Sequence, residues 1–177
     1  MKRLVLFISL IISHYTVFGQ TEKDSFLLGG LARVDLTNEP YAFFSPQLGM
    51  FMAKNFALGA TVPISFSSTE NSNSFYYGFG PFFRGYFGSS KFKPFLEGGI
   101  YFATEHTKFV NNNREFKSRR TDNKAHLATG ITYFLSPNIG LEGVLKYQVD
   151  REYEFTGANL IFNLGLQIYI PKKKNEN

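Results

Sequence analysis

The sequence contains no cysteine and no tryptophan among its 177 residues. Without cysteine the protein can form no disulfide bond, no thiolate nucleophile and no Cys-ligated metal site. The absence also excludes the lipid-modified cysteine that anchors a lipoprotein. A strong excess of one charge is lacking too: the formal net charge is +5, and Lys2 and Arg3 contribute to it from a segment that we expect to be removed. A mature charge of about +3 does not indicate a nucleic-acid-binding protein.

Hydrophobic residues make up 44% of the chain, yet the mean hydropathy is only −0.14, a value typical of a soluble protein. That value misleads where apolar and polar residues alternate, because a membrane strand turns only every second side chain towards lipid. The chain is instead rich in aromatic residues and glycine, with 21 Phe, 10 Tyr and 16 Gly. This composition favours strands over helices, and the length suits a single domain.

The N-terminal segment has the features of a secretory signal peptide. Lys2 and Arg3 precede the apolar run Leu4 to Ile12, and a more polar stretch leads from it to the small residue Gly19. The apolar run is too short for a transmembrane helix, which needs roughly 20 residues. We predict cleavage after Gly19, so that residues 1–19 are removed; an uncleaved anchor is the alternative. No later segment is apolar over a helical span, which excludes a multi-helix inner-membrane protein.

From Ser25 onward, apolar and polar residues alternate over segments of about ten residues, the length of a tilted membrane strand. The pattern predicts eight strands, near Ser25 to Leu36, Phe43 to Met52, Phe56 to Ser67, Ser74 to Phe87, Phe92 to Thr104, Lys124 to Leu135, Ile139 to Gln148 and Asn159 to Ile170. The connections alternate between tight turns and longer polar segments. We therefore predict an all-β fold, an eight-stranded antiparallel up-and-down transmembrane β-barrel with short periplasmic turns and longer extracellular loops.

Alternation alone does not distinguish a membrane barrel from a lipocalin-like soluble barrel, which turns its apolar face inward. A solvent-facing side would carry Lys, Glu and Thr with few glycines. Here the polar face is rich in small residues and tyrosine: Gly59, Gly78, Gly80, Gly99, Gly130, Gly140, Gly165, Ala57, Ala128, Tyr76, Tyr86 and Tyr101. This mixture is typical of the filled interior of a narrow barrel, so we predict that the apolar face contacts lipid.

Four prolines fall within or near the predicted strands: Pro46, Pro63, Pro81 and Pro94. Proline has no N–H group to donate to the ladder of hydrogen bonds between strands. We therefore expect these prolines at strand margins or at bulges.

The last predicted strand carries a specific pattern, in which a polar residue, a glycine and two hydrophobic residues are spaced as Asn163, Gly165, Ile168 and Ile170. With the eight segments and their alternating connections, it resembles the bacterial outer-membrane β-barrel family, similar to OmpX and the OmpA membrane domain, and especially its Bacteroidetes-type versions. In that family the pattern is the assembly signal recognised by the barrel-insertion machinery. Family members often stop on an aromatic residue, whereas this chain continues beyond Ile170.

The resemblance covers residues 20–171, the predicted barrel, and leaves residues 172–177 as a short basic periplasmic tail. It implies a location in the outer membrane of a Gram-negative bacterium. The implied surroundings are outer-membrane lipid and lipopolysaccharide, with the insertion machinery as a partner during assembly. The resemblance implies no cofactor.

Few charged residues fall on the predicted interior face: Arg33, Arg84, Glu97, Glu142 and Lys146, with Asp35 towards a rim. Buried ionic groups must pair, so we expect an internal salt-bridge network among them. A tight turn at Ser89-Ser90 would bring Arg84 and Glu97 to facing positions on neighbouring strands. Such a network would close the lumen. The alternative is a charged lining of a narrow pore, although eight strands leave an interior only wide enough for side chains.

His106 and His126 are predicted at the extracellular ends of two strands, where lipid A-modifying barrels carry out their chemistry, and a histidine can act as a general base. Lipid A deacylase barrels carry a His-x-Ser pair on one strand face. Here His126-Leu127-Ala128 has alanine in place of the nucleophile. We therefore predict no catalytic residue and no metal site, with both histidines at the rim; a lipid A-modifying enzyme is the alternative function.

The connection 105–123 is rich in basic residues, namely Lys108, Arg114, Lys117, Arg119 and Arg120. Asn111 to Asn113 predict a turn at its tip, so the flanking strands are expected to continue past the membrane as a hairpin. Its basic edge can bind the phosphates of lipopolysaccharide or an extracellular partner. The alternative is a solvated loop whose charges protect an edge strand from aggregation.

These features together predict a monomeric outer-membrane barrel with a filled, non-conducting interior. We expect a structural or surface-interaction role through the extracellular loops. We expect no cofactor and no nucleic-acid partner.

Overall fold

The computed structural model describes residues 21–35, 40–69, 72–88, 90–111, 114–150 and 158–172. The predicted cleavage site, the hairpin tip at 112–113 and the end of the C-terminal tail lie outside the described residues. The regular elements are all β-strands: β1 (Phe26–Asp35), β2 (Tyr41–Ala53), β3 (Phe56–Thr61), β4 (Ile64–Thr69), β5 (Ser72–Tyr86), β6 (Phe92–Asn111), β7 (Arg114–Ser136), β8 (Ile139–Asp150) and β9 (Ala158–Ile170). Across the described part of the chain, no helix is long and apolar enough to span a membrane.

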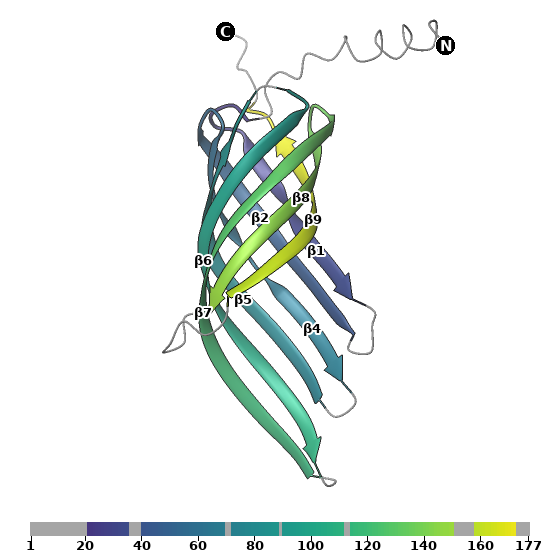
Figure 1. Ribbon diagram of the computed structural model, residues 1–177. Helices are drawn as coiled ribbons and strands as arrows, with labels where there is room; N and C mark the ends of the chain where they lie inside the picture. Colours follow the sequence, from purple (N-terminus) through teal and green to yellow (C-terminus); the bar gives the residue numbers. More distant parts are fainter. Residues whose placement is uncertain are drawn as a thin grey trace, which may run out of the picture.

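β3 and β4 are two parts of one barrel strand, interrupted at Val62 and Pro63. Both parts pair with β2 and with β5, and the register of Gln47 opposite Thr61 continues unchanged beyond the interruption. β1 pairs with β2 on one side and with β9 on the other, so the sheet closes on itself (Figure 1). All pairings are antiparallel between strands that follow each other around the ring. The fold is therefore the predicted eight-stranded up-and-down barrel.

The four prolines occupy two kinds of position. Pro63 lies at the interruption and Pro94 near the start of β6, as predicted. Pro46 and Pro81 lie well inside β2 and β5, so the prediction is wrong for these two. The carbonyl group of Pro46 still accepts a hydrogen bond from the Val62 amide at 3.0 Å, and β5 keeps one register with β6 on both sides of Pro81. One missing donor is tolerated because the flanking ladder bonds hold the register.

The two ends of the barrel differ, and we call them the turn end and the loop end (Figure 1). At the turn end, where the first and last described residues lie, Asn55 and Gly88 adopt the positive φ angles of tight turns, 65° and 78°. At the loop end β6 and β7 project beyond the other strands as the predicted hairpin, paired without interruption as far as Asn111 and Arg114. Both strands are longer than predicted, because the apolar alternation stops where the strands leave the apolar part of the surface.

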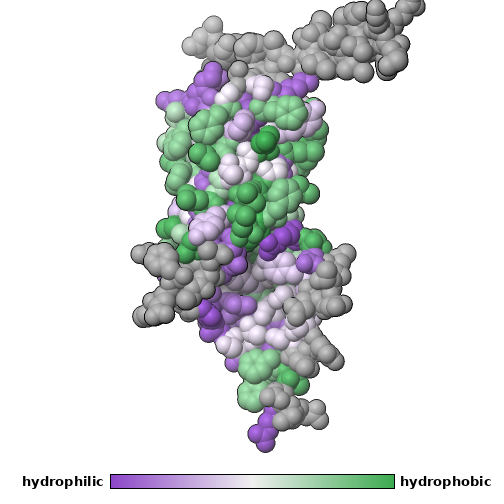
Figure 2. Space-filling model, in the orientation of Figure 1, coloured by the Kyte–Doolittle hydropathy of each residue, from purple (hydrophilic) through white to green (hydrophobic). Residues whose placement is uncertain are grey.

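The outer surface carries an apolar belt, which Figure 2 shows as a green band between hydrophilic zones. Large apolar side chains point outward from every part of the ring, and five of them are 49–64% exposed: Leu48, Phe83, Ile100, Leu127 and Leu164. Exposing a large apolar side chain fully to water costs about 1.5–3 kcal/mol relative to burying it, so these half-exposed side chains also favour lipid over water. The apolar face therefore points outward as predicted, and the lipocalin-like arrangement is excluded.

Glycine on the inner face allows close approach between strands. A Cβ atom added to Gly80 of β5 would lie 1.9 Å from the carbonyl oxygen of Ile100 on β6, and one added to Gly59 would lie 2.3 Å from that of Leu48. Backbone atoms cannot move aside cheaply. At Gly85, on the outer face of the same strand as Gly80, a Cβ atom would meet nothing within 4 Å.

The contrast between the two glycines of β5 is testable. Gly80→Ala is expected to lower the free energy of unfolding by about 1–3 kcal/mol, because the added methyl group overpacks the strand pair. Gly85→Ala is the matched control and should leave stability within about 0.5 kcal/mol of the wild type. Urea titration of the heat-modifiable folded band on gels measures both, and equal midpoints for the two variants would contradict the packing argument.

Candidate functional site

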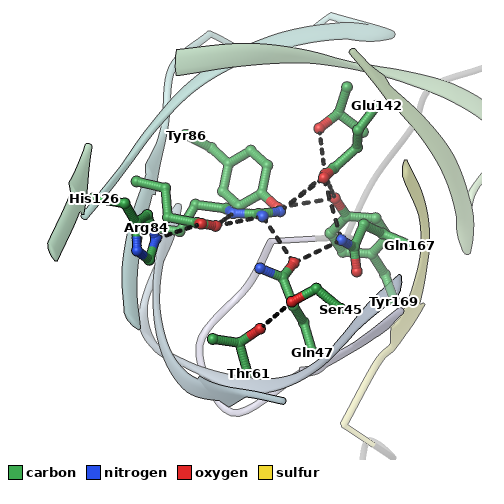
Figure 3. Close-up of polar contacts among 11 residues, drawn as sticks. Ser45, Gln47, Thr61, Arg84, Tyr86, His126, Glu142, Gln167 and Tyr169 are labelled. Carbon is green, nitrogen blue, oxygen red and sulfur yellow. Dashed lines mark hydrogen bonds and ion pairs between the residues drawn. The ribbon is translucent and has the colours of Figure 1, made fainter. Parts of the chain in front are cut away.

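Arg84 of β5 lies at the centre of the barrel with its side chain fully buried. The strand register places it directly opposite Glu97 of β6. Its Nε and Nη2 atoms donate to one carboxylate oxygen of Glu97 at 2.8 and 2.5 Å, and Nη1 donates to both oxygens of Glu142 of β8 at 2.9 and 3.0 Å (Figure 3). One guanidinium group therefore bridges two buried carboxylates across the lumen.

Neutral side chains complete the bonding of the guanidinium. Gln47 Oε1 accepts a hydrogen bond from Arg84 Nη2 at 3.0 Å, and the Tyr86 hydroxyl accepts one from Nη1 at 3.0 Å. Gln47 Oε1 also accepts from Gln167 Nε2 at 3.0 Å, and the hydroxyls of Tyr86 and Tyr169 lie 3.0 Å apart. These contacts join residues from five strands into one network, which we call the central network.

Both carboxylates have further partners besides Arg84. Glu97 Oε1 lies 3.1 Å from His126 Nε2. Glu142 accepts hydrogen bonds from three neutral donors at 2.9–3.4 Å: Thr132 Oγ1, Gln167 Nε2 and the Tyr169 hydroxyl. Because a buried charge is tolerated only when it is paired and its remaining hydrogen-bonding capacity is satisfied, this arrangement is what keeps two carboxylates and a guanidinium stable in the interior.

Aromatic rings fill the space between the central network and the turn end. The Phe95 ring centre lies 4.4 Å from Arg84 Cζ, close enough for a cation–π interaction. Phe51, Phe134 and Tyr169 pack with it as nearly inaccessible side chains. The lumen is therefore occupied across its width at the level of these rings.

The first described residues close the turn end itself. Thr21 is 2% exposed, and its hydroxyl accepts a hydrogen bond from Lys93 Nζ at 2.7 Å. The Thr21 carbonyl accepts one from the Asn55 amide at 2.7 Å. Lys172, just after β9, forms an exposed ion pair with Asp24 at 2.8 Å, and this contact lowers the pKa of Asp24. The two ends of the barrel chain are thus held together at the turn end.

Two of the predicted interior cations lie outside the central network, so the prediction of one network of five charges is wrong for them. Arg33 of β1 lies nearer the loop end, with Cζ 4.8 Å from the centre of the Tyr41 ring. Lys146 of β8 pairs with Ala128 of β7, which pairs in turn with Glu97. Neither cation forms an ion pair with a carboxylate among the described residues. The positions of Arg33 and Lys146 along the barrel axis depend on the stagger between neighbouring strands, which the sequence of a single strand does not reveal.

Asp35, predicted near a rim, is the last residue of β1 and is exposed.

His126 is the main correction among the candidate residues. It was expected at the rim, yet it is 4% exposed and bonded to Glu97, because β7 begins at Arg114 and reaches the rim well before this residue. His106 lies on the outer face, stacked on the Tyr77 ring with centres 6.0 Å apart. The described residues contain no group of three or more His, Asp or Glu side chains placed to hold a metal ion.

Sequence reasoning found the charged members of the central network and missed the neutral ones: Gln47, Thr132, Gln167 and Tyr169. A signal was present, because each falls on the inner face by its spacing from interior neighbours. Gln167, for example, alternates with the outward Leu166 and Ile168. The alternation of apolar and polar residues does not show that side chains from β2, β7 and β9 meet at the same position along the barrel axis.

The hairpin separates its basic residues between two faces. Lys108, Lys117 and Arg119 continue the outward face of the barrel, with Lys108 directly opposite Lys117. Arg114 and Arg120 lie on the other face, where the Phe109 and Phe116 rings stack with centres 5.3 Å apart. Arg120 is bonded to Asp122 at 2.9 Å, and Lys117 lies 3.5 Å from Glu115.

The predicted assembly signal lies on both faces of β9. Asn163 is buried and Gly165 is on the inner face, whereas Ile168 and Ile170 are exposed on the apolar belt. A Cβ atom on Gly165 would lie 2.7 Å from the Leu31 side chain of β1. β9 pairs with β1 from Ala32 to Phe26, so this strand closes the barrel.

Removing the central cation tests the energetics of the central network. Arg84→Met is expected to lower the free energy of unfolding by about 3–5 kcal/mol, because it leaves Glu97 and Glu142 buried without their cation. Arg84→Met combined with Glu97→Gln should recover part of the loss, since Glu142 keeps its three neutral donors. Urea unfolding in detergent micelles measures both. A double variant less stable than the single one would show that charge compensation is not the dominant contribution.

Comparison with known proteins gives the fold its context. No protein-family model matches the chain, and no curated protein sequence does. Among solved structures, the N-terminal β-barrel domain of Pseudomonas aeruginosa OprF is similar at 14% identity and a TM-score of 0.57, covering 84% of this chain and 98% of that one. Outer membrane protein OprG of the same organism is similar at 11% identity and a TM-score of 0.55, over 86% and 95%. Ail of Yersinia pestis is similar at 10% identity and a TM-score of 0.50, over 84% and 98%. The chain therefore shares the fold of these eight-stranded outer-membrane β-barrels.

Proposed function

We propose that the protein is a monomeric outer-membrane barrel with a closed interior, whose function lies in surface contacts made by the hairpin of β6 and β7. The observation that carries the proposal is the central network, in which Arg84, Glu97 and Glu142 fill the cross-section with fully buried side chains. A charged group that lined a conducting pore would be hydrated rather than buried and paired. Between the central network and the turn end, the aromatic rings also fill the lumen.

The orientation follows from the two ends of the barrel. Short turns typically face the periplasm and longer loops the exterior in outer-membrane barrels. We infer that the turn end, with Thr21 and Lys172, is periplasmic, and that the hairpin extends from the cell surface. A cleaved signal peptide of residues 1–19 and insertion through the signal at Asn163 to Ile170 belong to this proposal.

The outward face of the hairpin suits an anionic surface. Lys108, Lys117 and Arg119 lie on the outward face of β6 and β7, in the hairpin near its tip. Lys108 and Arg119 have no ion-pair partner among the described residues. Phosphate groups of lipopolysaccharide are the ligands that such side chains bind through charge-assisted hydrogen bonds.

A lipid A-modifying enzyme and a narrow pore are the alternatives, and the geometry favours neither. Of the two candidate histidines, His106 lies on the outer face, stacked on the Tyr77 ring. His126 is buried and bonded to Glu97 inside the barrel, which does not suit a general base acting on lipid A at the outer rim. A pore would have to pass Arg84.

Conductance measurements test the closed interior. The wild-type protein in planar bilayers is expected to give no stable single-channel steps, because the central network occupies the lumen. Arg84→Ala combined with Glu142→Ala removes the bridge across it but leaves the aromatic rings towards the turn end, so this variant is also expected to give no stable channel. Large, stable channels formed by the wild-type protein would overturn the proposal of a closed barrel.

Binding of purified lipopolysaccharide tests the hairpin surface. Removing two cations at an anionic surface costs about 1 kcal/mol each, so Lys108→Gln with Arg119→Gln should weaken binding roughly 30-fold at low salt, with a smaller difference at high salt. The control pair Arg114→Gln with Arg120→Gln removes the same charge from the opposite face. Equal losses in the two double variants would argue against an outward-facing contact surface.

A further inference from the structure

A partly open pocket lies inside the barrel, between the central network and the loop end. Its volume is about 460 Å³, and every strand of the ring contributes to its lining. We call it the vestibule. It lies apart from the central network, whose Arg84, Glu97 and Glu142 are absent from its walls. Pockets of this size are typical of binding sites for small molecules.

The vestibule has an excess of positive charge. Arg33, Lys124 and Lys146 line it, against a single carboxylate, Glu105, among the described residues. Lys146 is 4% exposed, and neither it nor Arg33 forms an ion pair with a described carboxylate. Lys146 has only the longer-range attraction of Glu97 and no direct contact with a described carboxylate. A buried ammonium group without a contacting anion is costly, so an anionic ligand would be stabilised there.

The remaining lining is polar and aromatic. Asn163 is 2% exposed, and its Oδ1 atom has no hydrogen-bond partner within the described part of the structure. Serine hydroxyls line the side formed by β4 and β5, at Ser65, Ser67 and Ser74, and the Tyr41 ring lies beneath the Arg33 guanidinium. Hydroxyl and amide groups beside an aromatic ring recognise the hydroxyls and apolar faces of a sugar.

We propose that the vestibule binds a small anionic sugar, a hydroxylated ring that carries a phosphate or carboxylate group. Arg33 and Lys146 hold the anionic group, and Asn163 with the serine hydroxyls holds the ring. This goes beyond the proposed function, because the outward face of the hairpin takes no part in it. The same chemistry is present in a free sugar phosphate and in the phosphorylated sugars of lipopolysaccharide, so the two sources must be separated by experiment.

Isothermal titration of the full-length protein in detergent tests the proposal with glucose 6-phosphate as the probe. Binding is expected for glucose 6-phosphate and for glucuronate, with glucose and inorganic phosphate each much weaker. Arg33→Gln and Lys146→Met should each weaken binding about tenfold, as expected for the loss of one charge-assisted hydrogen bond. Arg33→Gln keeps the test valid if Lys146→Met fails to fold, since Arg33 is only half-buried.

The control is Lys108→Gln with Arg119→Gln, which removes two positive charges outside the vestibule and should leave this binding unchanged. Absence of binding by the wild-type protein at roughly 10 mM ligand, well above a weak millimolar dissociation constant, would overturn the proposal. Equal binding of glucose 6-phosphate and inorganic phosphate would also overturn it, because the ring would then contribute nothing. The proposal would also be overturned if the hairpin control lost as much affinity for glucose 6-phosphate as the vestibule variants.

Competition identifies the source of the ligand. In nanodiscs that contain lipopolysaccharide, weaker apparent binding of glucose 6-phosphate than in phospholipid nanodiscs would support the vestibule as a site for a lipid-borne sugar phosphate. Unchanged binding would support a free sugar anion. Because these measurements do not depend on conductance or on the outward hairpin face, their failure is distinguishable from failure of the proposed function.

Discussion

A guanidinium group stays protonated in a protein, and Arg84 places one at the centre of a barrel that has room for side chains but little for water. An unpaired charge there would cost several kcal/mol, so the interior is arranged around its compensation by Glu97 and Glu142. Ladder hydrogen bonds join only neighbouring strands. The central network joins β5 to β8 and β2 to β9 across the lumen, and it therefore fixes the cross-section while filling it.

The same two-residue alternation produces both surfaces of the barrel wall. Large apolar side chains point outward and form the belt, while small residues such as Gly80 and Ala128 point inward and leave room for Arg84, Tyr86 and the aromatic rings. The distribution is the reverse of that in a soluble barrel, because here the apolar solvent is outside. Along the axis the interior then divides into aromatic packing at the turn end, the central network, and the polar vestibule at the loop end.

Much of the fold could be predicted from the sequence. The number of strands, their faces and the outward direction of the apolar side all follow from alternation, which is a local property of each segment. The prolines at positions 46 and 81 were misplaced because the rule that excludes proline from strands considers one hydrogen bond and not the flanking ladder that holds the register. His126 was misplaced because the polar continuation of β7 beyond the belt looks like a loop in the sequence, although it is a paired strand.

The candidate sites depended more on tertiary structure. Alternation identified the inward charges, but the stagger between strands separated Arg33 and Lys146 from Arg84, and the hairpin register divided five basic residues between two faces. By itself the sequence determined that this chain forms an eight-stranded barrel with an apolar exterior and a few interior charges, because side-chain direction along a strand depends only on the parity of residue numbers. Which interior groups meet was decided only in the tertiary structure, because it depends on the relative heights of strands that are distant in the chain.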